Sequence, residues 1–299
     1  MAESPFDEAS WREKLLRNRA GTLATFRDPR TSPFAVIRRA DFAGAAPDWK
    51  PLVVGSAESS DVALEGLPAH ALSVHARPDS FELEAIGSDS NFSVLGKSNS
   101  GEPFAEGPPV QRAKLGPGGR IKLGRYLLRF SHQNFPAVLV YDPEKAELSK
   151  AAMPVWFEPD PGWRLIARLE KDPQPREEIV QSTRGSKRHG LRIGALVFRA
   201  PGSEQDQRLT AIRLLEPGAG ESGFSIFFRD ATTGHESYPV GRYLEPELLD
   251  GDRWLVDFNG CYNPACAYST MFNCPIPPRE NKLAIAIRAG ERDPHPGEH

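Results

Sequence analysis

The sequence predicts an all-β protein that begins with one helix, continues as a β-sandwich and ends in a second β-sandwich or barrel-like domain. Short apolar stretches alternate with polar residues along most of the chain, as is typical of strands with one buried face. The 26 Gly and 28 Pro residues are spread along the chain and supply turns between these stretches. Only one segment, from about Phe6 to Ala24, has an apolar stripe with helical spacing, formed by Trp11, Leu15, Leu16 and Leu23.

The length of 299 residues predicts two domains, each large enough to bury a core of its own. A run rich in proline and charge, residues 141–162, forms the expected junction between them. We therefore expect a first domain with the helix and the sandwich over residues 1–140, a second β domain over residues 163–293, and a tail over residues 294–299.

The strands expected in the first domain are short and separated by turn clusters, which favours a sandwich or a small barrel. Phe81, Leu83 and Ala85, for example, alternate with Glu82 and Glu84. The expected strands of this domain are Leu52–Val54, Val62–Leu64, Phe81–Ala85, Ile121–Leu123, Tyr126–Phe130 and Ala137–Val140.

The second domain continues the same pattern, and the turn Arg184–Lys187 would close a hairpin within it. Because the segment Phe224–Phe228 is largely apolar on both faces, we expect that strand to be central in its sheet. The expected strands of this domain are Trp163–Leu169, Glu178–Ser182, Leu191–Phe198, Leu209–Leu215, Gly223–Phe228, Arg253–Phe258 and Leu283–Arg288.

Composition and charge argue against several function classes. The formal net charge of −3 gives no bulk attraction to nucleic acid or to an anionic membrane, so neither is an expected partner. No apolar run is long enough to cross a bilayer. The N-terminal residues lack the basic and apolar regions of a signal peptide, so we expect a cytoplasmic protein with reduced cysteines and no cofactor.

The segment Asp257–Arg292 is the most unusual stretch of the sequence, and we call it the Cys/Asn/Pro-rich segment. It contains all three cysteines, and its Asn-Pro and Pro-x-Pro-Pro steps prevent regular helix or strand over about twenty residues. A loop of that length is usually functional or disordered, and its Cys, Tyr, Phe and Met content argues against disorder. We expect an ordered and partly buried polar loop.

A second dense stretch, Arg229–Tyr243, follows the apolar strand directly. Its polar side chains, with those of the Cys/Asn/Pro-rich segment, would form either a pocket for a small polar or anionic ligand or a buried network that fixes two loops. We expect Arg242 to pair with a carboxylate of Asp230, Glu236 or Asp257. The candidate ligand-binding residues are Asp230, Glu236, Tyr238, Arg242, Asp257, Asn259, Tyr262, Asn263, Cys266 and Asn281.

Three interpretations of the cysteines stay open. Cys261, Cys266 and Cys274 are spaced unlike the paired ligands of zinc sites, and we predict no metal site. Cys266 with His235 and a neighbouring carboxylate would make a Cys-His-acid set, although no local signature of such a nucleophile accompanies it. The interpretation that we expect is packing of Cys266 and Cys274 as reduced thiols inside the loop.

Residues Leu52–Phe130 resemble a degenerate forkhead-associated domain, which implies a β-sandwich. The positions at which that family binds phosphopeptides are Ser56, Leu67 and Ser90 in this sequence. Because a phosphothreonine needs charge-assisted donors such as Arg, we expect the fold to be kept and phosphopeptide binding to be lost. The residues that carry the resemblance are Val54-Gly55-Ser56, Ala69-His70-Ala71, Ile86–Lys97 and Gly119–Gly124.

The two C-terminal stretches resemble a bacterial family known as domain of unknown function 1684, and the junction at Phe157–Arg164 resembles it as well. That family has no assigned reaction, so the resemblance implies the fold more than the function. The matching residues are Asp230, Thr232, Gly234, Glu236, Tyr238, Gly241, Arg242, Asp257, Phe258, Asn259, Tyr262, Asn263, Pro264, Cys266, Cys274, Pro275, Pro277, Pro278, Asn281, Leu283, Ala289, Gly290 and Glu291.

Two function classes follow from these observations. In the first, which we favour, the protein is a non-catalytic binding or interaction protein whose C-terminal domain holds a small polar ligand. In the second, it is a hydrolase-type enzyme that uses the acidic, Arg and Cys residues of the same stretches. A carboxylate or thiol with a shifted pKa beside an open concavity, as opposed to a fully closed network, is the feature that separates them.

Overall fold

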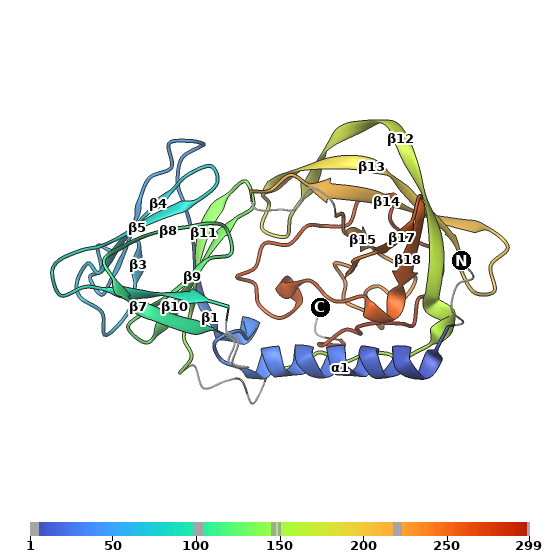
Figure 1. The fold of residues 1–299 in the computed structure, drawn as a ribbon, viewed down its shortest axis with the longest axis horizontal. Coiled ribbons are helices and arrows are strands. Elements are labelled where there is room, and N and C mark those ends of the chain that lie inside the picture. Colours follow the sequence, from blue (N-terminus) through green and yellow to red (C-terminus); the bar gives the residue numbers. More distant parts are fainter. Residues whose placement is uncertain (1–5, 98–103, 145–147, 149–150, 218–222, 298–299) are drawn as a thin grey trace. The chain divides into compact units, whose positions relative to one another are not determined.

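The structure of the protein is a computed structural model that describes residues 6–97, 104–144, 148, 151–217 and 223–297 (Figure 1). Within these residues the chain is mostly β, with one α-helix at the N-terminus followed by several sheets, which confirms the predicted fold class. Each sheet formed by the described strands is open, so the barrel-like alternative is not seen. Residues 145–147 and 149–150 of the predicted junction and residues 298–299 of the predicted tail lie outside the described residues.

The chain divides into two compact units. The C-terminal unit contains Met1–Phe26, Ala152–Leu215 and Gly220–His299, and the N-terminal unit contains Arg27–Ala151 and Glu216–Ala219. The first helix therefore belongs to the C-terminal unit, whereas the sequence analysis grouped it with the N-terminal sandwich. Within the described part of the chain, no helix is both long and apolar enough to span a membrane.

The N-terminal unit is a β-sandwich whose two sheets share one core. The sheets have the strand orders β1-β11-β10-β9-β6-β7 and β3-β2-β4-β5-β8. Val54 and Phe81 of the second sheet and Ile121 and Phe130 of the first are fully buried in the same core. The strands are β1 (Val36–Asp41), β2 (Leu52–Gly55), β3 (Val62–Ala63), β4 (Leu72–Ala76), β5 (Phe81–Ala85), β6 (Phe92–Gly96), β7 (Ala105–Val110), β8 (Arg112–Leu115), β9 (Arg120–Leu123), β10 (Tyr126–His132) and β11 (Pro136–Tyr141).

Helix α1 (Glu8–Arg27) packs on the C-terminal unit, where Trp11 Nε1 donates a hydrogen bond of 2.7 Å to Asp257 Oδ2. The predicted apolar stripe is only partly correct, because Leu15 is buried but Leu16 is 47% exposed. A helix that covers a core normally turns an apolar face inward. The inner face of α1 instead continues with the polar residues Asn18, Arg19 and Thr22.

The main sheet of the C-terminal unit has the order β14-β13-β12-β18-β17. Its longest strand, β12, joins the two expected strands Trp163–Leu169 and Glu178–Ser182 into one, with a register irregularity between Lys171 and Arg176. The predicted turn Arg184–Lys187 connects β12 to β13 as a hairpin. The strands are β12 (Arg164–Gln181), β13 (Lys187–Arg199), β14 (Asp206–Leu214), β17 (Glu247–Asp250) and β18 (Arg253–Asp257).

A separate sheet of two strands pairs β15 (Ile226–Phe228) with β16 (Arg242–Leu244). The prediction that the apolar strand Phe224–Phe228 is central in its sheet is therefore wrong, although every residue of β15 is buried. Core packing explains its apolar character, because Phe228 lies in the main core and Phe227 in a smaller cluster on the other side.

The last expected strand, Leu283–Arg288, is not a strand in the structure. Its backbone groups bond to side chains and loops instead of to a sheet. The backbone N–H of Ile287 donates to Asp230 Oδ2 at 2.7 Å, and the carbonyl of Ile287 accepts from Arg242 Nη2 at 2.8 Å. The alternating apolar residues of this segment pack on the main core without joining its sheet.

Candidate functional site

Arg242 and Asp230 form an ion pair inside the C-terminal unit, in the arrangement that the sequence predicts. Arg242 Nη2 lies 3.3 Å from Asp230 Oδ1, and the two side chains are 1% and 0% exposed. Arg242 Nη1 donates to the carbonyls of Ala289 at 2.5 Å and Glu291 at 3.2 Å, and Nη2 donates to that of Ile287 at 2.8 Å. The guanidinium therefore ties β16 to the end of the Cys/Asn/Pro-rich segment.

The carboxylate of Asp230 is fully engaged, whereas the Arg242 guanidinium has one buried nitrogen, Nε, without a partner. It accepts hydrogen bonds from the hydroxyls of Thr232 at 2.9 Å and Thr233 at 3.1 Å and from the N–H of Ile287 at 2.7 Å. Thr232 is in turn 2.8 Å from the Ser237 hydroxyl. Because these groups, apart from Arg242 Nε, satisfy one another away from solvent, the network matches the structural interpretation of this stretch and not the pocket interpretation.

At Gly290, the residue before Glu291, the backbone lies very close to Cys261. Its φ of +78° lies in the left-handed region, and a Cβ there would come within 2.3 Å of Cys261 Sγ and 2.6 Å of the Cys261 carbonyl oxygen. Only glycine fits this position without a shift of the surrounding backbone. The close approach fixes Glu291 beside the loop that contains Cys261 and Asn263.

A cavity of about 270 Å³ lies between α1 and the Cys/Asn/Pro-rich segment, entirely within the C-terminal unit. Aromatic and polar side chains from both segments line it, which is typical of a site for a small molecule. The lining residues are Leu15, Asn18, Arg19, Thr22, Phe26, Trp156, Asn259, Gly260, Cys261, Tyr262, Asn263, Tyr268 and Glu291.

Arg19, on the inner face of α1, has a guanidinium that is only partly paired. Its Nη1 donates to the carbonyl of Phe157 at 3.1 Å, and its Cζ lies 5.5 Å from the ring centre of Trp156. Its Nε and Nη2 are shielded from solvent and make no hydrogen bond. Burial lowers the pKa of Arg19, as expected for a cation removed from water.

Glu291 lines the same cavity from the Cys/Asn/Pro-rich segment. Its Oε2 accepts hydrogen bonds from the backbone N–H of Asn263 at 2.8 Å and from the Tyr268 hydroxyl at 2.9 Å. Burial nevertheless raises the pKa of Glu291 to about 7, against the lowering effects of these hydrogen bonds and of Arg242 and Arg19. Near neutral pH this carboxyl group is therefore present in both protonation states.

Two further groups of the cavity wall have distinct properties. Asn263 Nδ2 donates to the carbonyl of Arg292 at 2.7 Å, but Asn263 Oδ1 is buried with no hydrogen-bond partner. The thiol of Cys261 donates to the carbonyl of Ala289 at 3.4 Å, and burial raises the pKa of Cys261 to about 11. Cys261 is thus a neutral thiol and not a nucleophile at physiological pH.

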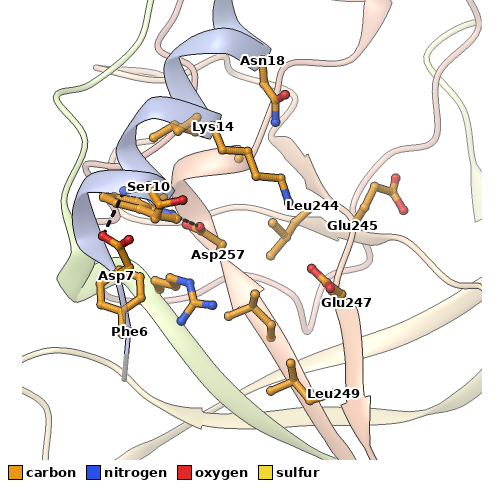
Figure 2. A pocket seen from close by; sticks show the side chains of 15 residues that line it. Phe6, Asp7, Ser10, Lys14, Asn18, Leu244, Glu245, Glu247, Leu249 and Asp257 are labelled. Carbon is orange, nitrogen blue, oxygen red and sulfur yellow. Dashed lines mark hydrogen bonds between the residues drawn. The ribbon is translucent and has the colours of Figure 1, made fainter. Parts of the chain in front are cut away.

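A wider groove of about 550 Å³ adjoins the cavity along α1, because Leu15, Asn18 and Gly260 line both. In Figure 2 the side chains of Lys14 and Asn18 extend from α1 above this groove, and Glu247 lies across from them on β17. The groove and the cavity are thus neighbours along the same face of the helix.

The predicted ligand-binding residues are divided among several places. Asn259, Tyr262 and Asn263 line the cavity, and Asp257 lines the adjoining groove. Asp230 and Arg242 belong to the closed network described above, and Glu236 forms a surface ion pair of 2.8 Å with Arg288.

Asn281, Tyr238 and Cys266 are not in the cavity wall. Asn281 links β14 to β15. Its side chain accepts a hydrogen bond from the backbone N–H of Thr210 at 2.7 Å and donates to the carbonyls of Thr210 at 3.0 Å and Phe227 at 2.9 Å. The Tyr238 hydroxyl donates to the carbonyl of Cys266 at 3.3 Å in a different part of the unit.

Cys266 and His235 have different surroundings, which does not favour the Cys-His-acid set. Cys266 packs against a cluster that contains Cys274 and lies 3.9 Å from the Tyr238 hydroxyl, whereas His235 is exposed on a turn. Among the residues that the structure describes, no group of three or more His, Cys, Asp and Glu side chains is placed to hold a metal ion.

The cavity residues that sequence reasoning missed include Arg19, Tyr268 and Glu291. Tyr268 and Glu291 lie in the segment that it singled out, and the lone acid after the small residues Ala289 and Gly290 was an available signal. No local signal distinguishes Arg19, because α1 also carries the basic residues Arg12, Lys14, Arg17 and Arg27.

Residues 154–292 match the model of a family described as Protein of unknown function (DUF1684). The C-terminal part of the chain therefore belongs to that family, as its two polar stretches predict. The chain is also similar to an uncharacterized protein of Haloarcula marismortui with a solution NMR structure, at 35% sequence identity and a TM-score of 0.39, over 49% of this chain and 78% of that chain. The comparison with curated proteins found no match.

Proposed function

We propose that the C-terminal unit binds a small polar ligand with a carboxylate or phosphoryl group in the cavity beneath α1. The observation that carries this proposal is the unpaired edge of Arg19, whose Nε and Nη2 are both buried without a hydrogen-bond partner. An unpaired buried donor costs free energy. Two such donors on one side chain therefore indicate a binding position for the acceptor group of a ligand.

The geometry of that edge defines the class of ligand. The Nε–H and one Nη2–H of a guanidinium point the same way, and together they match the two oxygens of a carboxylate or a phosphate. Because both nitrogens of Arg19 are also shielded from solvent, a ligand reaches them only after a side chain of the cavity wall turns aside.

Asn263 and Glu291 add a second requirement. Asn263 Oδ1 can only accept a hydrogen bond, so it needs an O–H or N–H group from the ligand. Glu291 can accept from such a group when ionised or donate when protonated, since its pKa is about 7. A hydroxy acid, an amino acid or a sugar phosphate offers both an oxyanion and a nearby donor.

Thermal unfolding of the full chain with millimolar glycolate, glycine, acetate and inorganic phosphate tests the proposal, with chloride at equal ionic strength as the control. Binding to the folded state raises the unfolding midpoint, and a ligand at 100 times its Kd adds about 2.7 kcal/mol. We expect glycolate or glycine to exceed acetate, and Arg19→Met to abolish the shift. Arg17→Met, the same substitution on the exposed face of α1, keeps it. No shift with any probe, or an equal shift in Arg19→Met, contradicts the proposal.

A hydrolase is the second candidate, and the raised pKa of Glu291 is the observation that favours it. A general base works best when its pKa lies near the working pH, and ionised Glu291 would then remove a proton from a water that attacks a substrate held by Arg19. Hydrolysis of p-nitrophenyl acetate and p-nitrophenyl phosphate by the wild type and by Glu291→Gln separates the two. An enzyme shows a rate that rises with a midpoint near pH 7 and is lost in the variant, whereas a binding protein shows only the buffer rate.

For the N-terminal unit we propose a forkhead-associated-like sandwich that has lost phosphopeptide binding. At the three positions aligned with the binding residues of that family, Ser56 is exposed, Leu67 is half-buried and Ser90 is buried. None of these side chains offers the charge-assisted donors that a phosphate group needs.

A further inference from the structure

A second site lies outside the cavity, where Cys266 meets Cys274. Cys266 lies in a short 3-10 helix, η5 (Ala265–Ala267), and is partly exposed, whereas Cys274 is only 7% exposed. Both cysteines belong to one small cluster with Phe227 and Tyr243, in which Cys274 is buried and Cys266 packs against the buried residues. The hydroxyl of Tyr238 lies 3.9 Å from Cys266 Sγ and is a donor for it.

The buried member of this pair is held firmly in place by Thr183, which follows β12. The backbone N–H of Cys274 donates to Thr183 Oγ1 at 3.1 Å, and the N–H of Thr183 donates to the Cys274 carbonyl at 2.9 Å. A partly exposed cysteine thus packs in the same cluster as a second cysteine that is fixed in place.

The surroundings of the two sulfurs favour the thiolate form of Cys266 over that of Cys274. The neighbouring Cys274 thiol is the main cause that lowers the pKa of Cys266, with smaller contributions from Tyr238 and Thr183. The proximity of Cys266, together with burial, raises the pKa of Cys274. The accessible sulfur is therefore the better nucleophile, and the buried one is its neighbouring thiol.

We propose that Cys266 and Cys274 form a peroxide-oxidisable dithiol site, in which Cys266 attacks the peroxide and Cys274 resolves the product. This inference is independent of the ligand proposed for the cavity, because the third cysteine, Cys261, lies in a different core cluster. In the reducing cytoplasm that the sequence predicts, the resulting disulfide would be transient.

The reaction balances with hydrogen peroxide as the oxidant. The Cys266 thiolate attacks one peroxide oxygen, the S–O bond forms as the O–O bond breaks, and the released hydroxide takes a proton to give water. The Cys274 thiol then loses its proton and attacks the sulfenic sulfur, so that the S–S bond forms and a second water leaves. Two electrons pass from the two sulfurs to the peroxide.

Thiol titration in denaturant and intact mass spectrometry of the full chain after peroxide treatment test the proposal. The wild type should keep one of its three thiols and lose about 2 Da, reversibly with dithiothreitol. Cys261→Ser, the matched control, should still lose two thiols. Cys266→Ser should lose thiols at least about 10-fold more slowly, and Cys274→Ser should form a dimedone adduct at Cys266.

Three results would overturn the proposal. The first is retention of all three thiols in the wild type at a peroxide dose that oxidises free cysteine. The second is equal oxidation rates in the wild type and Cys266→Ser. The third is a disulfide that contains Cys261, which peptide mapping of the oxidised protein detects.

Discussion

Arg242 and Arg19 are both guanidinium groups held inside the C-terminal unit, but their surroundings differ in kind. Arg242 has a buried carboxylate partner in Asp230 and donates to three backbone carbonyls. Arg19 has one carbonyl partner and an edge of two buried, unpaired nitrogens beside a cavity. Both terminal nitrogens of Arg242 are paired and only its Nε is buried without a partner, whereas Arg19 has no partner for Nε or for Nη2.

The comparison teaches how a buried charge can be assigned to structure or to function. A buried ion pair with satisfied hydrogen bonds is expensive to break but offers nothing to a ligand. A buried polar group without a partner lowers stability, and proteins tolerate such a cost mainly where a site requires it. The surroundings of Glu291 agree with this assignment, because its pKa is raised beside the same cavity.

The largest expected effect is the loss of stability when Arg242, the guanidinium with a buried carboxylate partner, is replaced. Arg242→Met leaves the Asp230 carboxylate buried without its cation, and we expect the unfolding free energy to fall by about 3–5 kcal/mol. Urea unfolding followed by tryptophan fluorescence measures this, since Trp11, Trp156, Trp163 and Trp254 all lie in the C-terminal unit. Arg288→Met, which breaks the exposed pair with Glu236, is the control and should leave stability unchanged. Equal stabilities of the two variants would remove the distinction.

The next effect is the pH dependence that Glu291 imposes. Its pKa of about 7 in the folded state lies above the ordinary 4.5, so between these values the folded state keeps a proton that the unfolded state loses. The stability advantage of Glu291→Gln over the wild type should therefore grow as pH rises from about 4.5 to about 7, by on the order of 3 kcal/mol, and stay constant above. Urea unfolding of both proteins across this range tests it, and a pH-independent difference contradicts the burial argument.

A smaller effect concerns the glycine that fixes the cavity wall. Gly290→Ala combines left-handed strain with a collision at Cys261, so we expect a loss of more than about 2 kcal/mol. Gly234→Ala has a similar φ of +81° but no heavy atom within 4 Å of the added Cβ, and should lose only about 1 kcal/mol. The same unfolding experiment compares them. Equal losses would show that the approach to Cys261 is not tight.

The last prediction is the absence of an effect: the N-terminal unit should not bind phosphopeptides. Isothermal titration of the full chain with a phosphothreonine peptide library should give no heat of binding, because Ser56, Leu67 and Ser90 offer no cationic donor. Micromolar binding that dephosphorylation abolishes would overturn this prediction.

The sequence predicted the buried ion pair of Arg242 better than it predicted the cavity beside Arg19. The pairing of Arg242 with Asp230 followed from the need of a polar-rich loop to satisfy its own groups, and the structure contains that pair. Arg19 could not be found in this way, because helical periodicity identifies the inner face of a helix by its apolar residues. It indicated Leu16 as buried, but that side chain is exposed. A polar group that packs inward breaks the pattern from which burial is predicted.

The prediction of the fold likewise succeeded in most places and failed where polar side chains replace regular partners. Alternation identified most strands and the hairpin between β12 and β13 correctly. It failed at Leu283–Arg288, where side chains of Asp230 and Arg242 bond to the backbone in place of a neighbouring strand. Alternation reports which face is buried, and it does not report what satisfies the backbone.

The unfolding free energy of Arg19→Met without ligand, measured beside that of Arg242→Met, tests the central claim most directly. The account predicts that Arg19→Met stays within about 1 kcal/mol of the wild type, because the loss of one hydrogen bond is offset by the removal of two unpaired donors. The same variant should lose the ligand-induced rise in unfolding midpoint that Arg17→Met keeps. If Arg19→Met is destabilised as strongly as Arg242→Met, Arg19 is a structural residue and the cavity beneath α1 is not the ligand site.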